Sequence, residues 1–181
     1  DRADRGTDEQ AAVVARLTAS LSSRSPSVSV LLSDRGRGKS SALGLAIAAL
    51  PADVRVVVSA AREEAVSELF RFATGRPGVT ETARLRFMAP AALLDAEADV
   101  IVVDEAAQMS LANVLAVSQA AKTLVLLGDP QQLDQPMQGS HPDGTGCSAL
   151  DHLLSGKQTI AADEGLFLDV TWRLHPDISG Y

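Results

Sequence analysis

The sequence predicts a three-layer α/β fold built around a mainly parallel β-sheet. Two observations lead to this prediction. Short apolar stretches alternate with helical patterns along the whole chain, as in folds that carry helices on both faces of a sheet. In addition, residues 99–103 (DVIVV) and 123–127 (TLVLL) are continuous apolar runs. Such runs are typical of strands buried on both faces of a parallel sheet.

The first half of the chain alternates helix and strand patterns. Apolar residues recur at near-helical spacing before Pro26, and an Ala/Leu-rich stretch ends at Pro51. The elements expected, in chain order, are a helix over 8–21, a strand over 27–32, a tight loop over 33–38, a helix over 39–50, a strand over 54–58, a helix over 63–73 and a strand over 84–88.

The second half adds the two apolar strands and a different kind of segment. Residues 134–146 are rich in Gly, Pro, Gln and Asp, so we expect a long ordered loop there. A short helix over 148–154 and a further strand over 166–171 follow.

Composition narrows the class of protein. The chain has 181 residues, of which 46% are hydrophobic and 22% charged, as in a globular domain. No apolar run approaches the roughly 20 residues of a membrane span, and the first ten residues are too polar for a secretory signal. Cys147 is the single cysteine, which excludes an internal disulfide and a cysteine-cluster zinc site. The cytoplasm is therefore the expected compartment.

The net charge of −7 bears on nucleic-acid binding. Proteins that hold nucleic acid by bulk electrostatics are usually basic. If this chain binds single-stranded DNA or RNA, it must use a local groove or a basic surface that lies outside it. Phosphate contacts are local, so the overall charge does not exclude binding.

The segment 33–40 (SDRGRGKS) predicts a phosphate-binding loop, because it follows a strand and opens a helix. Small residues let backbone N–H groups wrap phosphates, and the helix N-terminus directs its dipole at them. Lys39 would reach the β- and γ-phosphates, and the Ser40 hydroxyl would bind Mg²⁺. The usual pattern begins with Gly, whereas this one begins with Ser33. The alternative is an Arg/Gly-rich turn that happens to end in GKS.

An apolar strand then ends in two carboxylates, Asp104 and Glu105. In a parallel sheet this end lies at the carboxyl edge, where ligands bind. Asp104 would hold Mg²⁺ through water, and Glu105 would polarise the attacking water. The alternative is a solvated acidic strand end, which the phosphate loop upstream makes less attractive.

Two later segments carry further candidates. The strand over 123–127 runs into GDPQQL, in which Gln132 could contact the γ-phosphate and Asp129 the water network around Mg²⁺. In the segment WRLHP, Arg173 could place a positive charge on the γ-phosphate in the transition state. An ordinary Gly-Asp-Pro turn and a surface arginine are the alternatives.

Together, GKS, DEAAQ, GDPQQL and WRLHP resemble the ordered motifs I to IV of superfamily 1 helicases. The DEAAQ and GDPQQL pair resembles the branch of RNA and DNA helicases that includes the nonsense-decay helicase and helicases fused to RecB-like nucleases. Residues 128–178 are most similar to the latter group. The first half, with DRGRGKSSALGLA and the run MAPAALL to DEAA, resembles instead the helicase-like module of tRNA(Met) cytidine acetyltransferases. Both resemblances imply a RecA-like P-loop NTPase fold that uses ATP and Mg²⁺.

The resemblance also implies a set of site residues. By position, Gln10 matches the adenine-contacting glutamine that precedes motif I, although an exposed helix glutamine is the commoner explanation. Ser59 matches motif Ia, which touches the backbone of a single strand. The residues expected to bind nucleotide are Gln10, Ser33, Asp34, Arg35, Gly36, Arg37, Gly38, Lys39, Ser40 and Ser41. Those expected to act in catalysis are Lys39, Glu105, Gln132 and Arg173, and the metal ligands are Ser40 and Asp104.

Superfamily 1 motors close ATP between two RecA-like domains, and motifs V and VI come from the second. We therefore expect residues 1–165 to form the first domain and 166–181 to begin a second domain or an extension. Three functions remain open: the ATP-driven motor lobe of a DNA or RNA helicase, the ATPase module of an RNA-acetylating enzyme, and a nucleotide-binding lobe without turnover. The oligomeric state is left open.

Overall fold

The computed structural model describes residues 8–23, 25–32, 38–60, 63–79, 81–129, 147–155 and 166–167. A single parallel sheet with the strand order β3-β2-β4-β5-β1-β6 forms its centre. The strands are β1 (Ser27–Leu32), β2 (Val56–Ser59), β3 (Leu85–Phe87), β4 (Val100–Val103), β5 (Thr123–Gly128) and β6 (Leu166–Phe167).

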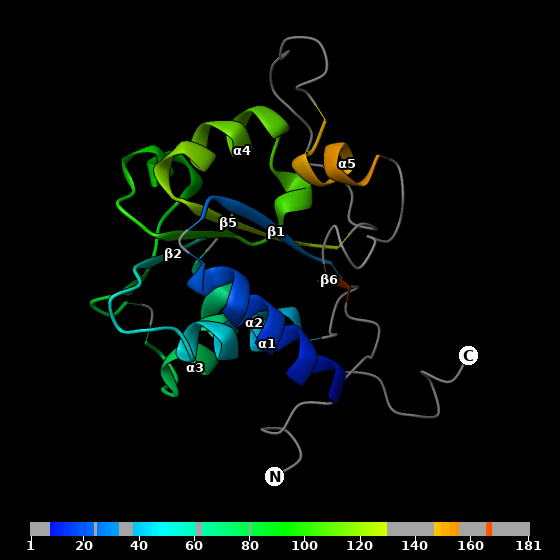
Figure 1. The fold of residues 1–181 in the computed structure, drawn as a ribbon. Helices are drawn as coiled ribbons and strands as arrows, with labels where there is room; N and C mark the ends of the chain where they lie inside the picture. The colour runs from blue at the N-terminus through cyan, green and yellow to red at the C-terminus, as the bar shows by residue number, and fades with distance from the viewer. Residues whose placement is uncertain are drawn as a thin grey trace.

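Helices cover both faces of this sheet, so the fold has three layers (Figure 1). One face carries α1 (Asp8–Ser22), α2 (Lys39–Ala48) and α3 (Ser67–Thr74), which continues the 3-10 helix η2 (Glu63–Val66). The other face carries α4 (Leu111–Val117), α5 (Ala149–Leu154) and the 3-10 helices η3 (Pro90–Asp95), η4 (Ala106–Gln108) and η5 (Ser118–Ala120). The expected three-layer α/β fold is confirmed.

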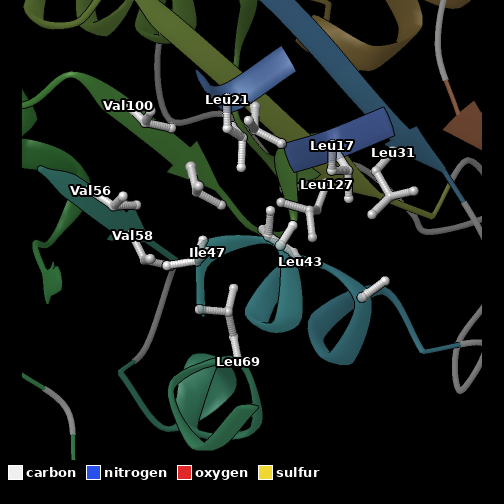
Figure 2. Packing of buried hydrophobic residues seen from close by; sticks show 14 of the residues in the cluster. Leu17, Leu21, Leu31, Leu43, Ile47, Val56, Val58, Leu69, Val100 and Leu127 are labelled. Carbon is white, nitrogen blue, oxygen red and sulfur yellow. The ribbon is translucent and has the colours of Figure 1, made fainter. Parts of the chain in front are cut away.

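Alternation along the strands divides the apolar side chains between two cores. Val56 and Val58 of β2 pack on the side of α1, α2 and α3 (Figure 2), whereas Val57 packs on the other side. The central strands are buried over their whole length. Each fully buried Val or Leu side chain contributes about 1.5–3 kcal/mol, which explains why continuous apolar runs mark these strands in the sequence.

Helix α2 approaches α3 closely because Gly44 has no side chain. A Cβ atom at Gly44 would lie 2.6 Å from the Leu69 carbonyl oxygen and 2.6 Å from Phe72 Cβ. The backbone of α3 therefore rests directly on α2, and this contact fixes α2 over the sheet.

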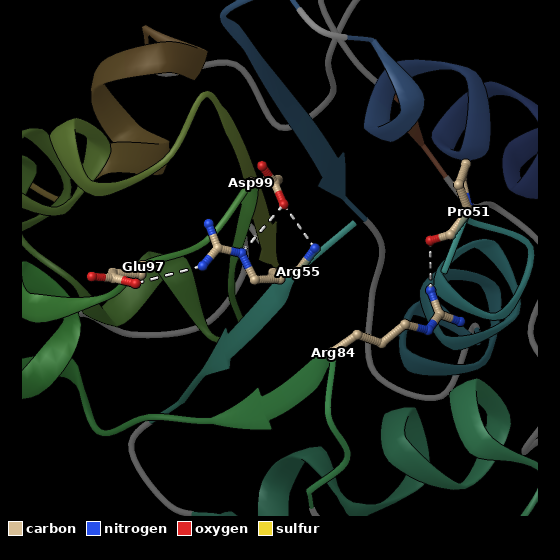
Figure 3. A network of polar contacts seen from close by, with 5 residues as sticks. All are labelled: Pro51, Arg55, Arg84, Glu97 and Asp99. Atoms are coloured by element: carbon tan, nitrogen blue, oxygen red, sulfur yellow. Dashed lines mark hydrogen bonds and ion pairs between the residues drawn. The ribbon is translucent and has the colours of Figure 1, made fainter. Parts of the chain in front are cut away.

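Polar contacts tie the amino edge of the sheet together (Figure 3). The backbone N–H of Arg55 donates to Asp99 Oδ2 at 2.8 Å, and the Arg55 guanidinium pairs with Glu97 at 3.5 Å. Arg84 donates to the Pro51 carbonyl at 3.3 Å, and also to the carbonyls of Ile47 and Leu50. A cation at a helix C-terminus is favourable for the helix dipole, so Arg84 holds the far end of α2.

Some helix and strand bounds match those expected from the sequence, and others differ. The strand expected over 27–32 is β1, and the helix expected over 8–21 is α1 with one more residue. The structure corrects the helix expected over 63–73. Residues 63–66 form a 3-10 helix, and the α-helix occupies 67–74. Helix α4 was not anticipated.

Two expectations concern the last third of the chain. The loop expected over 134–146 lies outside the described residues. Of the strand expected over 166–171, Leu166 and Phe167 pair with Leu31 and Leu32 of β1. These two residues extend the same sheet, although they fall beyond the domain boundary expected at residue 165, and that boundary stays a prediction.

Candidate functional site

The carboxyl ends of β1, β5 and β4 lie side by side in the sheet. Leu32 at the end of β1 pairs with Gly128 at the end of β5, and Leu126 pairs with Val103 at the end of β4. Because the strands are parallel, the segments that follow them meet at one edge, which is where open α/β sheets bind ligands.

Gly38, Lys39 and Ser40 form the N-terminal end of α2 at this edge. Gly38 adopts φ 85° and ψ 23°, the left-handed region that glycine enters without steric cost. Its carbonyl accepts from the Ala42 N–H at 2.9 Å. Gly38 offers this helix start no side-chain cap, and the first turn of α2 holds no acidic residue.

Lys39 stands at the helix end where a positive charge is disfavoured. The N-terminus of a helix carries a partial positive charge, so acidic groups or anions are favoured there. A lysine beside the uncapped N–H groups of α2 therefore suits a bound anion. Phosphate, sulfate and carboxylate groups are the anions found at helix N-termini.

Asp104 follows β4 and is held by two backbone hydrogen bonds. Its N–H donates to the Ser59 carbonyl at 2.8 Å, and its Oδ1 accepts from the Glu105 N–H at 2.8 Å. Burial raises the pKa of the Asp104 carboxyl, and the positive charge of Lys39 acts in the opposite direction. Cations near Asp104 therefore favour the ionised form of its carboxyl.

Glu105 has a left-handed backbone, with φ 55° and ψ 38°. Among the described residues only Ser155 shares a positive φ without being glycine. Such conformations cost about 1–3 kcal/mol and cluster at functional sites. The half-buried side chain of Glu105 comes directly after Asp104, where η4 begins.

Asp129 brings a third carboxylate to the same edge. On β5, Val125 and Leu127 pack on the α2 side of the sheet, and Asp129 is two residues further in the same phase. Its side chain is 6% exposed. The same alternation on β4, through Val102, brings Asp104 to the α2 side.

The residues present fit a magnesium-bound phosphate. Mg²⁺ prefers oxygen ligands and keeps several waters, so it is bound through one or two carboxylates plus phosphate oxygens. Ser40 and Asp104 supply a hydroxyl and a carboxylate, both half-buried. Within the described ranges, no cluster of three or more His, Cys, Asp or Glu side chains could hold a metal on its own.

The other expected residues fall into three groups. Gln10 is buried against Gly38, and Ser41 lies half-buried in the first turn of α2. Ser59 is fully buried, and its hydroxyl has no hydrogen-bond partner, so it does not present the surface group that a strand contact needs. The residues that lie outside the described part of the chain are Ser33, Asp34, Arg35, Gly36, Arg37, Gln132 and Arg173.

Two supporting contacts were not anticipated. A Cβ atom at Gly128 would overlap Leu150 Cδ1 and lie 3.6 Å from the Ala107 N–H, so glycine lets α5 and η4 close over the end of β5. Arg84 clamps the other end of α2, as described above. Neither contact leaves a signal in one sequence, because each joins residues that only the fold brings together.

The searched part of the chain includes no helix long and apolar enough to cross a membrane.

Comparison with known protein families gives one match. The helicase domain of RNA cytidine acetyltransferase NAT10/TcmA matches residues 30–128, which is more than half of the chain. A curated relative, the tRNA(Met) cytidine acetyltransferase TmcA of Vibrio cholerae, is 45% identical over 95 residues. The match covers 45% of this chain and 13% of that protein, so the chain spans a small part of the length of this relative.

Solved structures share the fold at low sequence identity. The Bacteroides Pif1 structure bound to single-stranded DNA has a TM-score of 0.57 and 14% identity, with 95% of this chain and 44% of that chain covered. The Pif1 helicase of Candida albicans has a TM-score of 0.57 and 17% identity, with 93% and 40% covered. At these identities the likeness concerns the fold, which is that of RecA-like helicase domains.

Proposed function

Because the chain belongs to the family of the NAT10/TcmA helicase domain of RNA cytidine acetyltransferases, we propose that it is the ATP-binding and ATP-hydrolysing module of an RNA-modifying enzyme. One observation carries this proposal: Lys39 at the start of α2 and Asp104 beyond β4 both lie at the carboxyl edge of the sheet, and the lysine charge acts to lower the pKa of the Asp104 carboxyl. A lysine at a helix start and a half-buried carboxylate are groups that suit a phosphate and its cation.

Each described residue has a distinct role in this proposal. The uncapped N–H groups of α2 and the ammonium group of Lys39 bind the β- and γ-phosphates of ATP. The Ser40 hydroxyl and the Asp104 carboxylate hold Mg²⁺, which neutralises charge on the phosphates when bound. Asp129 is buried at the same edge, and in this scheme it orders the waters around the cation.

Glu105 is the proposed base that orients the attacking water. It follows Asp104 directly and is half-buried, so its carboxylate can reach water at the edge of the phosphate site. Gln132, as the group that senses the γ-phosphate, and Arg173, as the transition-state cation, remain predictions from the motifs.

The proposed nucleic-acid partner is single-stranded RNA. The support is the RNA-modifying activity named for the matched family. With a net charge of −7, the strand would be held by local contacts and by a second RecA-like lobe beyond residue 165. The single cysteine supports the cytoplasm as compartment.

A second candidate function is the motor lobe of a superfamily 1 helicase. The segment GDPQQL at 128–133 supports it, because the segment resembles motif III of that group, and all but its first residue lie beyond the family match. In this case the ATP chemistry is unchanged, and the strand moved by the motor can be DNA.

Nucleotide hydrolysis by the full-length protein, measured with and without single-stranded RNA or DNA, tests the proposal. RNA-stimulated turnover is the expected result. Stimulation by DNA alone would favour the helicase motor, and tight ATP binding with no turnover under any condition would favour a lobe that only binds nucleotide. Absence of ATP binding would reject all three.

A further inference from the structure

Gln10 is a buried polar side chain at the end of an apolar stripe. Helix α1 packs on the sheet through Val13, Leu17 and Leu21, which recur at helical spacing. Gln10 precedes them by one turn on the same face and is 7% exposed. Polar side chains are buried only where they gain a specific interaction, so this position needs an explanation.

The space around Gln10 is set by Gly38. A Cβ atom at Gly38 would overlap Nε2 of Gln10 and lie 3.4 Å from its Cδ, and it would lie 3.6 Å from Ser41 Oγ. The amide of Gln10 thus fills the space that a side chain at Gly38 would need. The contact falls on the left-handed residue that starts α2.

We propose that Gln10 is a positioning residue for residues 38–40 at the start of α2, and that it sets affinity for the triphosphate chain instead of reading the base. The inference rests on the proposed function. Protein interiors are close-packed, so Gly38 cannot shift without moving the Gln10 amide. Gly38 is directly followed by Lys39 and Ser40, so the orientation of both phosphate-binding residues depends on this contact.

The two roles of Gln10 predict different dependences of ligand affinity on the base. A base-reading residue must offer hydrogen-bonding groups to the ligand, and its loss weakens adenine nucleotides selectively. A residue that positions Gly38 acts on the phosphate-binding residues and makes no contact with the base. Its loss weakens every ligand that carries a triphosphate, by the same factor.

Binding of Mg-ATP, Mg-GTP and Mg-tripolyphosphate to the full chain, measured by calorimetry, separates the two roles. Gln10→Ala should weaken all three by the same factor, about tenfold, which lies within the range of coupling energies between residues in contact. The exposed Gln119→Ala is the matched control and should change none. A loss confined to ATP overturns the proposal.

The isosteric variant Gln10→Glu distinguishes positioning near phosphate from packing alone. It preserves the shape of the side chain but sets a negative charge beside the loop, so it should bind all three ligands more weakly than Gln10→Ala does. Wild-type affinity in Gln10→Glu would mean that this side chain lies too far from the bound phosphates to influence them, and would overturn the proposal.

Thermal unfolding without ligand tests the contact independently of nucleotide. Gly38→Ala should lower the Tm less in a Gln10→Ala background than in the wild type, by about 2–4 °C for a coupling near 1 kcal/mol in a chain of this size. Additive losses would overturn the proposal. If the wild type binds neither ATP nor tripolyphosphate, the proposed function itself fails. If it binds both and only ATP binding responds to Gln10, this inference alone fails.

Discussion

Lys39 and Asp104 interact across the carboxyl edge of the sheet, although they belong to distant parts of the sequence. Burial raises the pKa of the Asp104 carboxyl, and the Lys39 ammonium group counteracts part of this rise. The strand order places β5 between β4 and β1, so the pair spans three strands. This relationship supports placing the proposed phosphate-binding lysine and the proposed metal ligand in one site.

Glu105→Gln is expected to leave ATP binding intact and to reduce ATP hydrolysis. The amide retains the shape of the side chain but cannot accept a proton, so Mg-ATP affinity should stay near the wild-type value. Turnover should fall by about 10²–10⁴-fold, the usual contribution of a general base. Phosphate release by the full-length protein measures this, with the exposed Glu97→Gln as control. Wild-type turnover in Glu105→Gln would remove the role assigned to Glu105.

Glu105→Gly is expected to raise stability while it abolishes turnover. The φ of 55° at Glu105 is costly for a residue with a Cβ atom and costs glycine little, so the gain should be about 1 kcal/mol. Ser155 has a φ of 50° at the end of α5 and provides the matched control. Ser155→Gly should raise the Tm without touching turnover. A lower Tm for Glu105→Gly would show that its backbone is not strained.

Asp104→Asn is expected to stabilise the ligand-free protein. The pKa of the Asp104 carboxyl is raised on folding, chiefly by burial, so the folded state binds its proton more tightly than the unfolded state. The free energy of unfolding therefore falls as the pH rises through the raised pKa of Asp104. The ionised carboxylate opposes folding at neutral pH. Asparagine lacks the charge.

The same variant should lose the Mg²⁺-dependent part of nucleotide stabilisation, because a carboxylate ligand is gone. Thermal unfolding at neutral pH, with and without Mg-ATP, measures both effects, and the exposed Asp53→Asn is the control. If Asp104→Asn destabilises the ligand-free protein and still responds to Mg²⁺ like the wild type, both the burial argument and the metal role fail.

Gly44→Ala should destabilise the fold more than Gly128→Ala. At Gly44 the added Cβ meets a backbone carbonyl and a helix Cβ, both at 2.6 Å, and neither can move without shifting α3. At Gly128 it meets the end of the Leu150 side chain, which can rotate. We expect a loss of about 1–3 kcal/mol at Gly44 and a smaller one at Gly128, measured by denaturant unfolding. The reverse order would contradict the α2–α3 packing described here.

Sequence patterns predict those elements whose signals are local. The bounds of β1 agree because Pro26 precedes an apolar run and a Gly-rich segment follows it. Helix α4 was missed because LANVLAV is short and nearly uniformly apolar, so its period is indistinct. The Ser110 hydroxyl, which accepts from the Asn113 N–H at 3.3 Å, is the capping signal that could have found it.

The candidate site also combines features that have local sequence signals with features that have none. The helix start at Lys39 and the acidic end of β4 lie where contiguous motifs next to a strand predicted them, and the roles of their residues stay predictions. The left-handed backbone of Glu105 and the contact between Gln10 and Gly38 depend on strand order and helix packing. Neither is encoded in the spacing of a single sequence.

The direct test of the central claim is a titration of the protein with a fluorescent ATP analogue and Mg²⁺, in the wild type and in Lys39→Ala. Lys122 serves as the control, because it is exposed and precedes β5 at the opposite edge of the sheet. We expect Lys39→Ala to bind at least about tenfold more weakly, as for a lost hydrogen bond to a charged group, and Lys122→Ala to bind like the wild type. Equal affinity of the wild type and Lys39→Ala would contradict the assignment of a phosphate-binding site to this edge of the sheet.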